Sequence, residues 1–105
     1  MTSAENTARA VEILAASRLG GGPTDRLPDP LMPETVVEGY DLQNQLNAHL
    51  TQAGFGPVVG HKIGCTTKVM QDYMKISEPC AGEIFATMEF HERADVQIEL
   101  YHRIG

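Results

Sequence analysis

The chain has 105 residues and a formal net charge of −6, which predicts one domain with a modest hydrophobic core. The acidic balance argues against nucleic-acid and membrane-surface partners, because both need clustered lysine and arginine. No apolar run approaches the length of a membrane span, and the opening MTSAENTARA lacks the apolar region of a signal peptide. The two cysteines are expected to be reduced thiols, and we expect a cytoplasmic protein.

One helix is predicted near the start of the chain. Apolar residues recur at helical spacing over residues 7–18, and polar residues occupy the other side. The run GGG at 20–22 predicts the end of this helix, since helices commonly end on a glycine. Four of the six prolines then fall within PTDRLPDPLMP (23–33). This segment predicts an ordered but irregular connector, because proline has no backbone N–H to donate.

A second helix is predicted over residues 34–53, with Gly54 as its C-terminal glycine. Leucines follow each other at intervals of four residues and form an apolar stripe on a surface that is otherwise polar. The stripe consists of Val36, Tyr40, Leu42, Leu46 and Leu50.

The second half of the chain alternates short strands with one helix. The glycine-bounded run PVVGHKIG predicts a strand over 57–64. Thr66 or Thr67 can cap a helix that reaches Met74. The order expected after that helix is a turn at ISEPCAG (76–82), a strand from Gly82 to Met88, a polar loop at EFHERAD (89–95) and an alternating strand at VQIELYHRI (96–104).

The expected domain organisation follows from this order. Residues 1–105 form a single or partial α+β domain. It has a helical part at 1–56, which includes the connector at 20–33, and the start of a mixed sheet at 57–105. Because the chain stops at Gly105, directly after an alternating strand with an open edge, we expect a larger sheet and a longer protein.

Lys62 is the first candidate for chemistry. The glycines that flank it would let a ligand approach the strand closely, and its cation suits an anion or an enolate. The alternative is an exposed strand lysine whose stem covers apolar surface. Composition and spacing leave both interpretations open.

The loop from Gly64 to Thr67 is a second candidate. Backbone amides at a helix start, with two hydroxyls, can hold a carboxylate or a phosphate, although a plain helix cap explains the same residues. Cys65 and His61 would make a nucleophile and a base, but they are four residues apart and no third group orients them. The histidines lack the spacing of a metal site. Glu78 and Glu83 would serve as acid or base only if they were buried.

A family resemblance changes the weight of these alternatives. GHKIGCTTKVMQDYMKISEPCAGEIFATM (60–88) resembles the segment G-[RH]-K-[IV]-G-x-T-[ST]-x-x-[MV]-Q…P-x-x-G-x-[IL] of 2-oxopent-4-enoate hydratases and 4-oxalocrotonate decarboxylases. These enzymes belong to the wider fumarylacetoacetate hydrolase family. Upstream, ETVVEGYDLQNQL (34–46) is similar to that group's helix, in which an aromatic residue and an Ile/Leu–Gln pair precede the motif.

The resemblance implies a fold and a reaction. Family members build a mixed β-roll against which an N-terminal α/β portion packs, and this chain would be that portion. A divalent ion, Mg²⁺ or Mn²⁺, held by carboxylates would chelate a short 2-oxo acid and stabilise the enolate that forms while water adds or CO₂ leaves. By the same resemblance Lys62 would be catalytic, and the substrate pocket would be lined by Gly64, Cys65, Thr66 and Cys80.

Two departures from the family's pattern stand out. Cys80 replaces the aspartate that the family places in P-D-x-G, and a thiol cannot do a carboxylate's proton transfer unchanged. The family's E-x-E metal ligands are also missing, since Glu99 in IEL lies too early to belong to that pair. The sequence therefore assigns no metal ligand to this chain.

The resemblance thus predicts the N-terminal portion of a carbon–oxygen lyase that is inactive as this short chain. The reaction would be hydration of an unsaturated 2-oxo or 2-hydroxy acid such as 2-hydroxypenta-2,4-dienoate, in aromatic catabolism. The expected partners are that small-molecule acid and further copies of the chain in a homo-oligomer. Two alternatives remain open: a related 4-oxalocrotonate-type decarboxylase, and a non-catalytic binding or assembly module that pairs its exposed strand edge with a partner.

Overall fold

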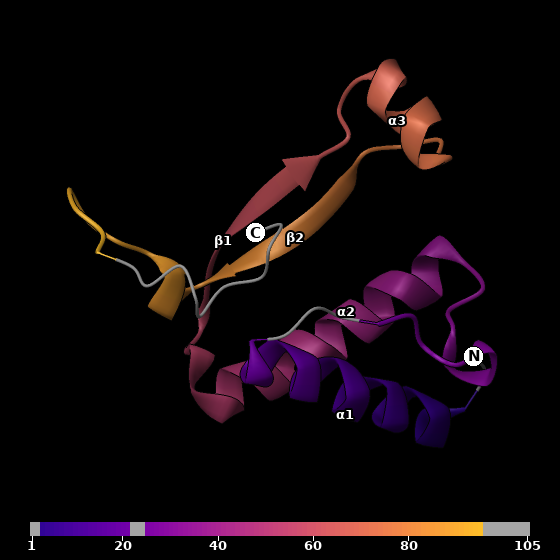
Figure 1. The fold of residues 1–105 in the computed structure, drawn as a ribbon, viewed down its shortest axis with the longest axis horizontal. Coiled ribbons are helices and arrows are strands. Elements are labelled where there is room, and N and C mark those ends of the chain that lie inside the picture. Colours follow the sequence, from indigo (N-terminus) through magenta and orange to yellow (C-terminus); the bar gives the residue numbers. More distant parts are fainter. Residues whose placement is uncertain (1–2, 22–24, 96–105) are drawn as a thin grey trace.

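The protein is an α+β structure in which two helices lie beside a two-stranded sheet (Figure 1). The computed structural model describes residues 3–21 and 25–95. The predicted α+β class is confirmed for these residues, and the predicted strand at 96–104 lies outside them. The elements are α1 (Ala4–Gly20), α2 (Val36–Leu50), β1 (Val58–Gly64), α3 (Lys68–Met74) and β2 (Cys80–Phe85).

Each helix begins at a hydroxyl residue that caps it. The side chain of Ser3 accepts a hydrogen bond from the backbone N–H of Asn6, so α1 starts three residues before the predicted position. Thr35 caps α2, which starts within two residues of the predicted position, and of the two threonines proposed for α3 it is Thr67 that accepts from the N–H of Met70. These caps satisfy backbone donors that the first turn of a helix leaves without partners.

A tight turn joins α2 to β1. After α2 the chain makes a π-helical turn, Thr51–Phe55, in which Gly54 has a φ of 115°. Gly56 follows with a φ of 78°. Residues with a side chain rarely adopt such angles, so these two glycines allow the chain to reverse and enter the sheet. The predicted end of the helix at Gly54 is wrong for α2 itself, which ends at Leu50, although Gly54 is the residue at which the π-helical turn leaves helical backbone angles.

The proline-rich connector takes part in the core. It contains one turn of 3₁₀ helix, Asp29–Leu31, and it buries two leucines between the helices. An irregular but ordered connector is confirmed for residues 25–33. The first core cluster consists of Ala10, Val11, Leu27, Leu31 and Leu42.

The strands β1 and β2 form an antiparallel hairpin with α3 in the connection between them. Here the predicted boundaries are wrong at both ends of β2. It begins at Cys80, because β1 continues to Gly64 and offers Cys80 a pairing partner. It ends at Phe85, because residues Ala86–Met88 turn into a 3₁₀ helix. There the hydroxyl of Thr87 donates to the carbonyl of Phe55 at 2.9 Å.

A second core cluster joins the helices to the hairpin. It consists of Ala15 from α1, Leu50 from α2 and Phe85 from β2. The ring of Phe85 meets that of Phe55 edge to face, with centroids 5.2 Å apart. The guanidinium of Arg18 lies 5.6 Å above the centroid of the Phe55 ring. Among the described residues, no helix is long and apolar enough to cross a membrane.

Candidate functional site

The hairpin has two faces, and the register of its strands decides on which face each predicted site residue lies. Paired residues of antiparallel strands point to the same face, and successive residues of one strand point to opposite faces. Lys62 pairs with Gly82, and Gly64 pairs with Cys80. Lys62 and Cys80 therefore share one face of the hairpin, and His61 and Glu83 share the other.

Lys62 lies along β1 with its stem across Gly82. A Cβ atom built on Gly82 would lie 3.1 Å from Cε and 3.5 Å from Cγ of Lys62. Because Gly82 has no side chain, there is room for the stem of Lys62 above it. Lys62 itself is exposed. Both sequence interpretations describe part of this geometry: the stem covers the neighbouring strand, and the ammonium group is free to meet an anion.

The two cysteines contact each other at the end of the hairpin that carries α3. Cys65 follows the last residue of β1 with a φ of 55°, and its carbonyl accepts a hydrogen bond of 3.0 Å from the side chain of Gln71. A hydrogen bond between the thiols of Cys65 and Cys80 raises the pKa of Cys65, and burial and charge repulsion add to the shift. Cys80 is the more exposed of the two.

Thr66 lies in the exposed loop between β1 and α3. The four residues from Lys62 to Cys65 with Cys80 are therefore neighbours on the hairpin, and Thr66 follows Cys65 directly. Because Thr67 supplies the helix cap, the hydroxyl of Thr66 is not used for capping.

The opposite face of the hairpin contains a set of polar contacts that sequence reasoning missed. The side chain of Asn47 is buried and donates a hydrogen bond of 2.9 Å from Nδ2 to Oε1 of Glu83. The other carboxylate oxygen of Glu83 lies 3.5 Å from Nε2 of His61. His61 therefore faces Glu83 and not Cys65, as expected from the register, which pairs His61 with Glu83.

Two further residues of α2 hold the backbone of β2. The N–H of Ala81 donates to the hydroxyl of Tyr40 at 3.0 Å, and the side-chain amide of Gln43 donates to the carbonyl of Ala81 at 3.1 Å. Tyr40, Gln43 and Asn47 are spaced at i, i+3 and i+7, so they lie on one side of α2. This polar spacing was the available sequence signal for the contact between α2 and β2.

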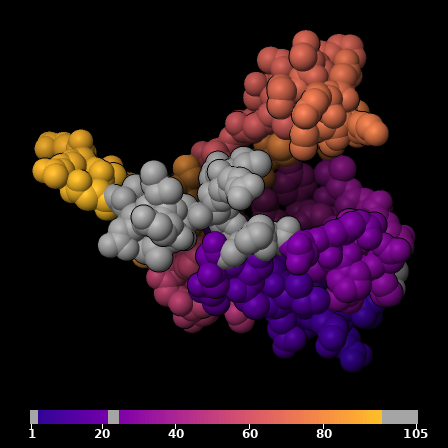
Figure 2. Space-filling model, viewed as in Figure 1, coloured from indigo at the N-terminus to yellow at the C-terminus, as the bar shows by residue number. Residues whose placement is uncertain are grey.

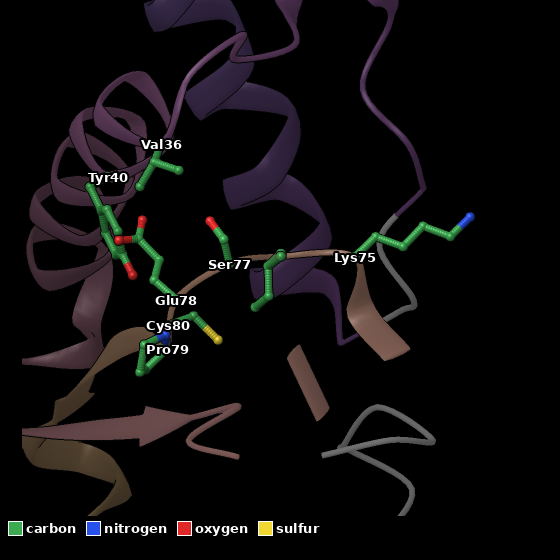
Figure 3. A pocket seen from close by; sticks show the side chains of 8 residues that line it. Val36, Tyr40, Lys75, Ser77, Glu78, Pro79 and Cys80 are labelled. Carbon is green, nitrogen blue, oxygen red and sulfur yellow. The ribbon is translucent and has the colours of Figure 1, made fainter. Parts of the chain in front are cut away.

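A shallow hollow lies where α2 begins and β2 starts (Figure 3). It has a volume of about 490 Å³. The side chains of Tyr40, Glu78 and Cys80 project toward this space, whereas Lys75 extends away from it (Figure 3). Two of the candidate residues, Glu78 and Cys80, line it, and the hollow meets the Lys62 face at Cys80.

The described residues do not fit the divalent ion that the resemblance implies. They contain no group of three or more His, Cys, Asp or Glu side chains that could hold a metal ion, and a carboxylate-bound Mg²⁺ requires several oxygen ligands. Glu99 lies outside the described residues. The Lys62 face supplies a cation and two thiols, which suit the binding of a negatively charged ligand and the transfer of a proton.

Comparison with known proteins finds curated hydratases. The chain is 34% identical over 67 residues to the 2-oxo-hept-4-ene-1,7-dioate hydratase of Escherichia coli, a match that covers 64% of this chain and 25% of that protein. It is 30% identical over 91 residues to the 2-hydroxyhexa-2,4-dienoate hydratase of Comamonas testosteroni, with 87% and 33% covered. It is 28% identical over 94 residues to the 2-keto-4-pentenoate hydratase of Paraburkholderia xenovorans (strain LB400), with 90% and 35% covered.

The chain therefore spans between a quarter and about a third of the length of the curated relatives it matches. No family model matches it, and no solved structure matches it, so the family's β-roll stays a prediction. The relatives are named as hydratases, and neither the decarboxylase nor the non-catalytic alternative is favoured. These matches confirm the resemblance seen in the sequence: the chain is related to the hydratase group of the fumarylacetoacetate hydrolase family.

Proposed function

We propose that this chain is part of a hydratase, a carbon–oxygen lyase, that adds water to a short unsaturated 2-oxo acid. The observation that carries the proposal is the shared face of Lys62 and Cys80, in a chain whose relatives are named for the hydration of such acids. 2-Hydroxypenta-2,4-dienoate, in its 2-oxo tautomer, is the substrate we would test first.

The hydration reaction requires a cation next to the substrate, and Lys62 would supply it. When water adds to a double bond conjugated with the 2-oxo group, negative charge develops on the carbonyl oxygen as an enolate. An ammonium group that meets this oxygen stabilises the transition state more than the neutral ground state. The substrate carboxylate carries a charge throughout the reaction, so Lys62 would contribute to both binding and rate.

A proton must also reach the α-carbon of the enolate. Cys80 is the acidic side chain on the same face as Lys62. Cys80 stands where the family pattern has an aspartate, and a thiol can donate a proton to a carbanion-like centre. Cys80 is thus proposed as the proton donor, and a divalent ion as a cofactor whose ligands we do not assign to the described residues.

The test is a substitution that removes the charge of Lys62 and keeps its stem. In the natural protein, Lys62→Met preserves the contact across Gly82 and should lower kcat/KM for 2-hydroxypenta-2,4-dienoate by about 100-fold or more, as loss of a transition-state charge partner does. Turnover is followed as loss of the ultraviolet absorbance of the conjugated acid.

Lys68→Met is the matched control. Lys68 is an exposed lysine on α3 that pairs with Asp72 at 3.1 Å, and its loss should leave kcat/KM within about twofold because exposed ion pairs contribute little. Equal activity of the Lys62→Met variant and the natural protein would remove the proposed role of Lys62. No hydration by the natural protein with Mg²⁺ or Mn²⁺ present would reject the function itself.

A further inference from the structure

The contact between the two thiols has no role in the proposed reaction. Cys65 and Cys80 lie at the two ends of the segment that contains α3, and the neighbouring Cys80 thiol raises the pKa of Cys65. Cys80 Sγ points across the hairpin toward β1, since it would lie 3.7 Å from a Cβ built on Gly64. The chain has two cysteines in all.

We propose that Cys65 and Cys80 form a reversible intramolecular disulfide, which makes this end of the hairpin a thiol–disulfide exchange site for low-molecular-weight disulfides. The geometry carries the inference. Residues joined by a disulfide must have Cα atoms a few ångströms apart and side chains that converge. Gly64 and Cys80 are direct cross-strand partners, and Cys65 is the next residue along β1.

The positive φ of Cys65 turns the chain at the point where the contact needs it. A non-glycine residue at a φ of 55° is uncommon. An ordinary extended residue after Gly64 would point to the face opposite Cys80, because side chains alternate along a strand. The left-handed backbone at Cys65 ends this alternation and brings its thiol to Cys80. The hydrogen bond from Gln71 to the Cys65 carbonyl holds the backbone in that position.

The exchange proceeds in two steps that balance. Cys80, the more exposed thiol, attacks one sulfur of a small disulfide as its thiolate and releases one thiol. Cys65 then loses its proton to solvent and attacks the Cys80 sulfur of the mixed disulfide, which releases the second thiol. The protein loses two protons and two electrons, and the small disulfide gains them.

The product would have a defined effect on the hairpin. The bond would join the end of β1 to the start of β2 and close the segment 66–79, including α3, into a loop. It would also remove the Cys80 proton from the face that holds Lys62. If the proposed function holds, oxidation would therefore lower hydration, but the state of the thiols can be measured without any activity.

The experiment uses the 105-residue chain, glutathione disulfide and mass spectrometry under non-reducing conditions. At low protein concentration the chain should lose two hydrogens in mass and both free thiols, and dithiothreitol should restore them. After trypsin digestion, which cuts at the lysines between the cysteines, the peptides 63–68 and 76–93 should be joined. Cys65→Ser and Cys80→Ser should each take up one glutathione instead.

Folding should favour the internal bond. The equilibrium constant against glutathione should be about tenfold or more larger for the folded chain than for the chain unfolded in urea, because the fold raises the effective concentration of one thiol at the other. Glutathione adducts on both cysteines, disulfide-linked dimers, or equal constants in the folded and unfolded chains would each overturn the proposal. None of these results bears on the hydratase activity, so the two proposals can fail separately.

Discussion

The helical part and the hairpin part of this molecule are stabilised in different ways. The buried apolar residues come from α1, α2 and their connector, with Phe85 as the contribution from the hairpin. Most large apolar side chains between residues 58 and 95 are exposed instead, and α3 has no buried residue. In Figure 2, α3 stands away from the rest of the molecule at the far end of the hairpin. The exposed set comprises Val59, Ile63, Val69, Met70, Tyr73, Met74, Ile76, Met88 and Phe90.

The difference shows what holds each part in place. The helices and their connector bury most of the apolar residues of the two core clusters, and such burial is the dominant favourable term in folding. The hairpin depends on Phe85 at one end and, further along β2, on hydrogen bonds from Tyr40, Gln43 and Asn47 of α2. Hydrogen bonds give a modest net stabilisation but are costly to break at buried positions. The hairpin should therefore be the less stable part, and its attachment should be open to single substitutions.

The largest effect is expected at the apolar end of the attachment. Phe85 is 2% exposed and packs on Leu50 and Phe55. Phe85→Ala should lower the free energy of unfolding by about 3–5 kcal/mol, because it removes a buried ring and leaves a cavity. Urea denaturation followed by circular dichroism measures the change. Phe90→Ala is the matched control, since Phe90 is 50% exposed, and a loss there as large as at Phe85 would contradict the comparison.

A smaller effect is expected at the polar end. Asn47→Ala removes the donor to Glu83 and should lower the free energy of unfolding by about 1–3 kcal/mol, as the loss of a partner for a half-buried charged group does. Asn44 is exposed on the same helix, and Asn44→Ala should change stability by less than about 0.5 kcal/mol. Hydrogen exchange should become faster in β2 for Asn47→Ala alone. Unchanged exchange in β2 would show that α2 does not hold it through Asn47.

The helix caps distinguish the two parts directly. Thr35 and Thr67 make the same kind of cap, with 3.1 Å and 3.2 Å between donor and acceptor. Thr35→Ala should lower the global free energy of unfolding by about 1 kcal/mol, since α2 is part of the core. Thr67→Ala should only fray α3, with a global change below about 0.5 kcal/mol. Equal losses in urea denaturation would mean that α3 unfolds together with the helices.

The last effect concerns the reactivity of one thiol. The hydrogen bond to Cys80 raises the pKa of Cys65. This hydrogen bond stabilises the protonated thiol. Its contribution to the stability of the fold is therefore present below the pKa that Cys65 has in the unfolded chain, and it is lost as pH rises through the pKa that Cys65 has in the folded chain. Cys80→Ala should lower the pKa of Cys65 and shift the pH profile of its alkylation by iodoacetamide toward lower pH.

Peptide mass spectrometry of the residues around position 65 follows this alkylation. The rate for Cys65 at mildly alkaline pH should be higher in Cys80→Ala than in the natural chain. Thr66→Ala, which changes a neighbouring side chain and keeps both thiols, should leave the profile unchanged. An unaltered or slower reaction of Cys65 in Cys80→Ala would show that the two thiols do not interact.

Much of the fold could be predicted because its signals are local. The cap at Thr67 and the glycine-bounded apolar run of β1 each produce a sequence signal within a few positions. The start of β2 at Cys80 could not be predicted in the same way, because Pro79 and the short residues near it indicate a turn. Pairing with Gly64 of β1 overrides that local preference.

The same distinction between local and long-range signals applies to the candidate site. The sequence by itself determined that Lys62 lies on a strand between glycines and that a capped helix follows it, since the glycine-bounded apolar run and the threonine before the helix are both local signals. The tertiary structure alone decided that Lys62 shares a face with Cys80, that Cys65 reaches the same thiol, and that Glu83 meets Asn47 and His61. These contacts join residues 15–36 positions apart, and they exist because α2 docks on β2 and fixes the register of the hairpin.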